Sequence, residues 1–142
     1  MKKILILAIA ACASMAMAQI PIGPTVKDPK QIEWKASGTL PPGAEFHALS
    51  EDKNTSAIQT LVRFKAGYLL PAHSHSSDEI IVVISGKLGI EMGNEEKTLT
   101  PGGYASIPAG TPHTLRAKGF HACEILVSLS GPFDILGLPA VK

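Results

Sequence analysis

Turn-forming residues divide this chain into short segments along most of its length. The breaks contain glycine, often with proline, asparagine or lysine, and fall at near-regular intervals at 41–43, 86, 93–94, 101–103, 108–110 and 118–119. Outside the first 18 residues, no segment shows the sustained 3.6-residue apolar stripe of an amphipathic helix. Many short segments with evenly spaced turns are typical of antiparallel sandwiches and barrels. The pattern therefore predicts an all-β fold.

The segments between the breaks have the composition of strands. We expect strands at 32–35, 45–49, 57–64, 79–84, 87–92 and 96–99, with a tight hairpin turn at Gly93-Asn94. The segment 57–64 is rich in β-branched and apolar residues, and 79–84 is almost wholly apolar. The segment 87–92 alternates, which places Leu88, Ile90 and Met92 on one face.

The first 18 residues have the pattern of a signal peptide. A charged start, Met1-Lys2-Lys3, precedes a short apolar run, and Ala16-Met17-Ala18 supplies the small-x-small pattern of a cleavage site. Cleavage after Ala18 would start the mature chain at Gln19 and predicts an exported protein, periplasmic or secreted. The apolar run is too short and too rich in alanine for a comfortable membrane span.

Cys12 offers an alternative interpretation of the same segment. Residues 9–12 loosely resemble a lipobox, which would make Cys12 the lipidated anchor of a lipoprotein. The residues after Cys12 stay apolar, whereas a lipoprotein usually has a polar tether. If Cys12 is removed, Cys123 is the remaining thiol, and the fold then has no internal disulfide. The alternating run 124–127 after Cys123 indicates a buried, unreactive thiol.

Beyond the signal peptide, we expect an irregular lead-in at 19–30 and one domain at 31–142. The lead-in contains three prolines and one glycine, and the rest is long enough for one core but too short for two. Without Lys2 and Lys3, eleven basic residues face twelve acidic ones. This balance predicts neither a nucleic-acid partner nor a membrane-surface patch.

Four side chains form a candidate metal site: His73, His75, Glu79 and His113. On a strand, His73 and His75 would leave the same face, and Glu79 follows a polar turn where a hairpin could return its carboxylate to them. His113 follows a proline- and glycine-rich turn at 108–112. Nitrogen and oxygen ligands without thiolate suit borderline to hard divalent ions.

Each of these residues also has a simpler explanation. A lone histidine is usually a surface residue or a hydrogen-bonded core residue, and we assign His47 and His121 to that class. A His-x-His pair alone is weak support for a metal site. The glycines and prolines around the four residues are what strengthen the prediction.

That framework forms two blocks in a fixed spacing. The first is Gly67, five residues, His73-x-His75, three residues, Glu79, six residues and Gly86; the second, fifteen residues later, is Gly102, five residues, Pro108-x-Gly110, two residues and His113. The two blocks resemble the paired motifs of the cupin superfamily, and the resemblance runs from Gly67 to about Ala117. The second motif commonly ends in Asn, where this chain has Ala117. That Asn is not a metal ligand in the family, so the difference concerns the local turn or pocket wall.

The resemblance implies a double-stranded β-helix, which is a small jelly-roll barrel with a metal in its mouth. Similar proteins hold one divalent transition metal, Fe, Mn, Zn, Ni or Cu, with three imidazoles and one carboxylate. Such a shell leaves coordination positions open, which is typical of catalytic sites.

Two classes of function follow from the resemblance. The first is an exported metal-dependent enzyme acting on a small polar molecule, as a dioxygenase or as a Lewis-acid isomerase, lyase or hydrolase. The alternative is a non-catalytic metal- or ligand-binding protein or sensor. A storage role is disfavoured because storage cupins usually lack the ligands.

Two further features stay open at the level of sequence. Arg63, Tyr68, Tyr104 and Arg116 could meet an anionic substrate, but base rates favour rim or surface positions. The apolar tail at 131–136 could close one end of the barrel or pack in a homodimer.

Overall fold

The computed structural model describes residues 24–138, and strands make up most of its regular structure. After a single-turn 3₁₀-helix, η1 (Pro29–Gln31), come β1 (Lys35–Ala36), β2 (Ala44–Glu51), β3 (Ile58–Phe64), β4 (Leu69–His73), β5 (Glu79–Ser85), β6 (Leu88–Met92), β7 (Glu95–Leu99), β8 (Tyr104–Ile107), β9 (His113–Ala117) and β10 (Cys123–Leu129). The expected signal peptide at 1–18, including Cys12, and the start of the lead-in lie outside the described residues. Within 24–138, no helix has the length and apolar character needed to cross a membrane.

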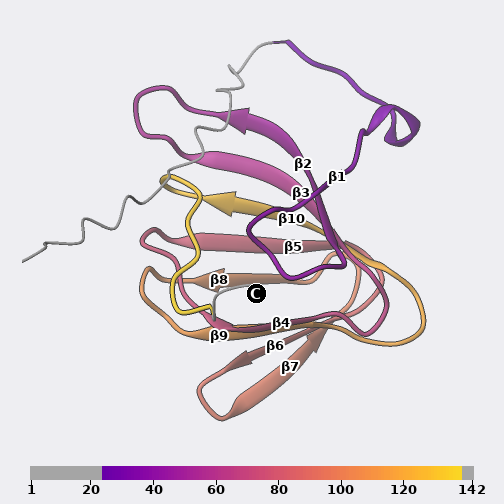
Figure 1. The fold of residues 1–142 in the computed structure, drawn as a ribbon, viewed down its shortest axis with the longest axis vertical. Helices are drawn as coiled ribbons and strands as arrows, with labels where there is room; N and C mark the ends of the chain where they lie inside the picture. Colours follow the sequence, from indigo (N-terminus) through magenta and orange to yellow (C-terminus); the bar gives the residue numbers. More distant parts are fainter. Residues whose placement is uncertain (1–23, 139–142) are drawn as a thin grey trace, which may run out of the picture.

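The strands form two sheets, which are labelled in Figure 1. The larger has the order β1-β2-β3-β10-β5-β8, and the smaller has the order β4-β9-β6-β7. Neighbouring strands are antiparallel throughout both sheets. Strands adjacent in space are often distant in sequence, as β10 lies between β3 and β5. This arrangement confirms the predicted all-β jelly-roll barrel.

The core lies between the two sheets and is filled from alternating positions. In β5 the inward residues Ile81 and Val83 are buried, while Ile80 on the opposite face is half exposed. Leu88 and Leu115 contribute to the same core from the smaller sheet. Full burial of such a side chain stabilises the fold by about 1.5–3 kcal/mol relative to an exposed one. In β5 the sequence is almost wholly apolar, and it is the burial that alternates, because successive side chains of a strand point to opposite faces.

Two strand predictions need correction. In place of the strand expected at 32–35, only the two-residue β1 forms, because only Lys35–Ala36 pairs with β2. Just before this segment, Asp28 and Gln31 form a reciprocal capping box that stabilises η1. The strand considered for His73 and His75 together is β4, which ends at His73 and contains Pro71, a residue that is rare in strand interiors. Pro71 is tolerated there because β4 is an edge strand and its pairing with β9 is interrupted between Leu70 and His73.

Three positions of interest from the sequence lie within or beside the core. Cys123 is fully buried, and burial, followed by the nearby Glu124 charge, raises the pKa of its thiol to about 11. Ala117 is also buried, and its backbone N–H donates to the Tyr68 carbonyl at 2.9 Å. Gly86 turns the chain at a φ of 79°, where a Cβ would approach the Ala122 carbonyl oxygen to 2.5 Å. Only glycine fits that turn without strain.

Candidate metal centre

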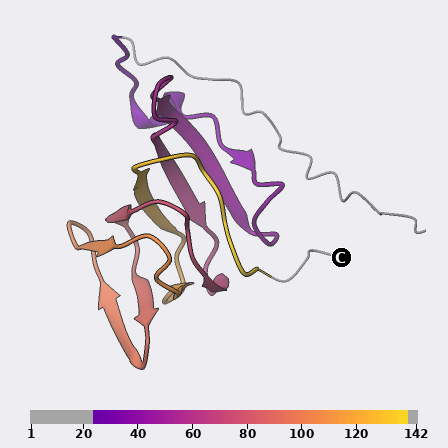
Figure 2. The same cartoon turned by 90° about the vertical axis from the view of Figure 1, so that its left-hand side faces the viewer.

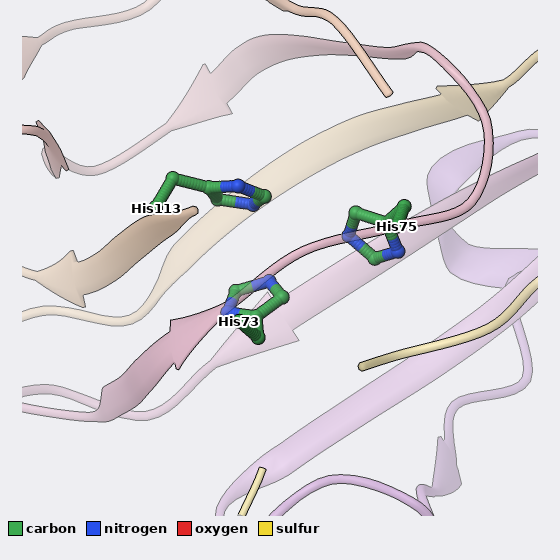
Figure 3. Close-up of side chains that lie close together, drawn as sticks. All are labelled: His73, His75 and His113. Atoms are coloured by element: carbon green, nitrogen blue, oxygen red, sulfur yellow. The ribbon is translucent and has the colours of Figure 1, made fainter. Parts of the chain in front are cut away.

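Three histidines converge at one end of the barrel interior. His73 is the last residue of β4, His113 is the first of β9, and the two are direct partners across the ladder. His75 lies two residues beyond β4 in a loop, so His73 and His75 do not share one strand as expected. All three are buried, and one ring nitrogen from each lies within 4.8 Å of the others. Figure 3 shows the three rings gathered in one place.

Each imidazole is oriented by a backbone carbonyl at its Nδ1 atom. His73 donates to Pro71 at 2.8 Å, His113 donates to Thr111 at 3.0 Å, and His75 donates to Asp134. A neutral imidazole carries one N–H, so these bonds place the proton on Nδ1 and leave the Nε2 lone pair free to bind. This is the arrangement that metal-binding histidines commonly have.

Glu79 lies beside two of these imidazoles, and neither its Oε2 atom nor the facing ring nitrogens have a hydrogen-bond partner. Its Oε2 atom lies 3.1 Å from His113 Nε2 and 3.5 Å from His75 Nε2. All three atoms are buried without hydrogen-bond geometry to any partner. Buried polar atoms without partners cost free energy, and a carboxylate costs most. A divalent cation would satisfy the carboxylate and the imidazole lone pairs together, so the residues fit a metal.

The electrostatics of two of the histidines differ. Burial, with a smaller contribution from the neighbouring His113 and His75, outweighs the opposing Pro71 carbonyl and lowers the pKa of His73 to about 4. At neutral pH His73 is therefore in the metal-binding form. Burial also acts to lower the pKa of His113, but Glu79 and the Thr111 carbonyl outweigh it and raise that pKa.

Backbone contacts between two loops hold the ligand-bearing segments together. The Gly110 N–H donates to the His75 carbonyl at 2.8 Å, and the Ala109 N–H donates to the Asp78 carboxylate at 2.8 Å. Gly110 adopts a φ of 74°, which favours glycine. The Pro-x-Gly turn of the second motif therefore bonds directly to the loop of the first.

The C-terminal segment also reaches this end of the barrel. Figure 2 shows it running back alongside the strands after β10. Leu136 and Ser74 exchange two backbone hydrogen bonds, and Phe133 and Ile135 pack against the core. Of the two roles that the sequence left open for this tail, the structure shows closure of the barrel end. Asp134 was not singled out from the sequence, although it is the one acidic residue in an otherwise apolar tail.

The other polar residues considered from the sequence are engaged elsewhere. Arg63 binds Glu124 at 2.8 Å and stacks over Trp34, while Tyr104 and Arg116 are exposed. Tyr68 is buried, stacks on Phe64 and donates to the Pro41 carbonyl, and burial raises its pKa to about 12.

The two remaining histidines lie apart from the cluster. His47 Nδ1 contacts the Glu33 carbonyl at 3.0 Å, and His121 is exposed. Their positions agree with the structural and surface roles expected for them.

Comparisons with known proteins found a matching family model and similar proteins. The family model described as "Cupin domain" matches residues 60–129, which include His73, His75, Glu79 and His113. The DNA damage-repair/toleration protein DRT102 of Arabidopsis thaliana is 38% identical over 96 residues, covering 66% of this chain and 29% of that protein. Quercetin 2,3-dioxygenase of Bacillus subtilis (strain 168) is 33% identical over 78 residues, covering 51% of this chain and 23% of that protein. The chain thus spans less than a third of the length of these curated relatives.

The barrel also has close structural counterparts. The polyketide cyclase RemF from Streptomyces resistomycificus superposes with a TM-score of 0.70 at 16% identity, over 84% of this chain and 89% of that one. At this identity the likeness concerns the fold alone. Together, the matched domain at 60–129 and the jelly-roll barrel support the assignment of this chain to the cupin superfamily.

Proposed function

We propose that this protein is a metal-dependent cupin that binds one divalent transition metal and acts on a small polar molecule at that metal. The ligands would be His73, His75, Glu79 and His113. One observation carries the proposal: buried imidazole and carboxylate atoms face one another without hydrogen-bond partners, while backbone carbonyls hold every Nδ1. Structural histidines would normally have both nitrogens satisfied or exposed.

An enzymatic role is favoured by the ligand number. Four protein ligands leave coordination positions open on an octahedral ion, whereas structural zinc sites close their shell. A bound ion would supply Lewis-acid polarisation or, if redox-active, oxygen chemistry. The chain's own contribution is to hold the imidazoles in one tautomer and to place one negative charge beside two of them. The names of the relatives, a dioxygenase and a cyclase, are compatible with either reaction class.

The metal content tests the central claim. Wild-type protein produced with metals available should carry close to one transition metal per chain after gentle purification. His75→Ala should lose most of it, while His121→Ala, which changes an exposed histidine, should keep it. Metal-free wild-type protein would refute the proposal, as would full loading of the His75 variant.

A second experiment separates an enzyme from a binder. The Fe(II) form is screened anaerobically for spectral change with candidate substrates and then exposed to O₂. Substrate-dependent O₂ uptake supports a dioxygenase, and turnover by the Zn(II) or Mn(II) form without O₂ supports Lewis-acid chemistry. Tight ligand binding without turnover by any form would favour the non-catalytic sensor instead.

We further propose that the protein is exported, on the basis of the pattern in residues 1–18. The intact mass of the mature protein tests this, since cleavage after Ala18 leaves Gln19 as the first residue. A lipidated Cys12 at the N-terminus would favour the lipoprotein alternative, and an uncleaved chain would contradict both.

A further inference from the structure

We propose that Asp134 is a positioning residue for His75, and that the segment 131–138 (the C-terminal strap) is the outer support of the metal centre. This inference rests on the proposed metal function. It concerns residues that lie outside both sequence motifs and outside the matched cupin domain, which ends at residue 129. It assigns a role to the tail beyond closure of the barrel.

The three histidines are not held in the same way. The Nδ1 partners of His73 and His113 are carbonyls two residues away, in the same strand or turn. The Nδ1 partner of His75 is the carbonyl of Asp134, 59 residues away. His75 also lies outside every strand, so no ladder determines the direction of its side chain. Its orientation therefore depends on a segment from the end of the chain.

Asp134 holds His75 and the residue that follows it. Its carbonyl accepts from the imidazole, and its carboxylate oxygens accept from the Ser76 N–H at 3.1 and 3.3 Å. The same carboxylate lies 3.8 Å from His75 Nδ1. A hydrogen-bond acceptor and a negative charge at the outer nitrogen make an imidazole a better ligand and restrict its rotation.

The strap is itself held in register against the barrel. Ser74 and Leu136 exchange hydrogen bonds of 3.0 and 2.9 Å, so consecutive residues 74, 75 and 76 are each bonded to the strap. Phe133, Ile135 and Leu138 pack against the core. Gly131 allows a close approach, because a Cβ there would lie 3.1 Å from the Ser77 Cβ. The strap thus connects His75, which lies outside the strands, to side chains that pack against the core.

Two variants of Asp134 separate its roles. Asp134→Ala removes the acceptor for the Ser76 N–H and the charge beside His75 Nδ1 but keeps the backbone carbonyl, whereas Asp134→Asn keeps a side-chain oxygen without the charge. Glu95→Ala, which removes an exposed carboxylate on β7, is the matched control. Two quantities are measured in the full chain: Zn(II) affinity by chelator competition, and the tautomer of each histidine in metal-free protein by long-range ¹H–¹⁵N NMR.

We expect Asp134→Ala to weaken Zn(II) binding about 10- to 100-fold, the range typical of lost outer-shell partners. The Asp134 carbonyl stays in the variant, but it is no longer fixed by the carboxylate contact to Ser76, so it should hold His75 Nδ1 less firmly. In the metal-free protein, the His75 signals should therefore change from a single Nδ1–H form towards an average of tautomers, while His73 and His113 keep theirs. Asp134→Asn should retain most of the affinity and the His75 tautomer, and Glu95→Ala should match the wild type.

Other results would overturn the inference. Wild-type affinity and an unchanged His75 signal in Asp134→Ala would do so, as would equal changes at all three histidines, which would indicate general loosening. If Asp134→Ala does not fold, Asp134→Glu is used instead, because it displaces the carboxylate by one methylene. An unchanged His75 signal in that variant would also overturn the inference. If the wild type binds no metal, the proposed function fails, while the NMR comparison still decides the role of Asp134.

Discussion

The inward faces of β5 and β9 pass from a polar to an apolar environment within two residues. β5 begins with Glu79 and continues inward with Ile81, and β9 begins with His113 and continues with Leu115. All four side chains are buried, at 3% exposure or less. The apolar pair stabilises the barrel, whereas the polar pair places atoms without partners beside one another. The two regions share strands, but burial lowers the free energy of the fold at the apolar pair and raises it at the polar pair. Buried groups that destabilise the fold are expected at functional sites.

The largest effect should come from the apolar region. Ile81→Ala removes a fully buried side chain and should lower the free energy of unfolding by about 2–5 kcal/mol, since it also leaves a cavity. Ile80→Ala, one residue away on the outward face, is the matched control and should cost far less. Urea denaturation measures both. Equal losses would contradict the distinction between the two faces of β5.

An intermediate effect is expected when the pH is lowered on metal-free protein. Burial, reinforced by His113 and His75, lowers the pKa of His73 from 6.5 to about 4 in the folded state. The unfolded chain therefore takes up this proton first, and stability should fall as the pH drops from about 6.5 to 4. The contribution of His73 should total about 3 kcal/mol over that window.

His73→Phe is the variant that isolates this contribution. Chemical denaturation across the pH range should show a flatter profile for the variant than for the wild type. His113, whose pKa is raised, acts in the opposite direction in both proteins, so the difference between the two profiles reports His73 together with its interaction with His113. Parallel profiles would mean that His73 does not resist protonation in the fold.

The smallest effect should have the opposite sign. Glu79→Met replaces a buried carboxylate, one oxygen of which has no hydrogen-bond partner, with an apolar side chain of similar length, and should raise the stability of the metal-free protein by about 1 kcal/mol. The stabilisation that added metal gives the wild type should disappear. Thermal unfolding with and without Zn(II) measures both, and a destabilised metal-free variant would show that Glu79 supports the fold.

The sequence by itself determined the alternation and the turns. Strands expected at 45–49, 57–64, 79–84, 87–92 and 96–99 correspond to β2, β3, β5, β6 and β7, because β-branched and apolar content, alternation at 87–92 and the turn residues between segments are all local features. The same local spacing selected His73, His75, Glu79 and His113 as one candidate site. Whether they bind a metal stays a prediction, but the structure brings the three imidazoles together with Glu79 beside two of them.

Only the tertiary structure decided the features that depend on distant partners. Proline is disfavoured in a strand interior, and the place of the Pro71-bearing strand β4 at a sheet edge is known only once the sheet is assembled. Asp134 has no local signal that links it to His75, because their contact spans 59 residues. Local sequence encodes which residues point inward and where the chain turns. Which segments then meet depends on the closure of the barrel, and closure placed the C-terminal strap against His75.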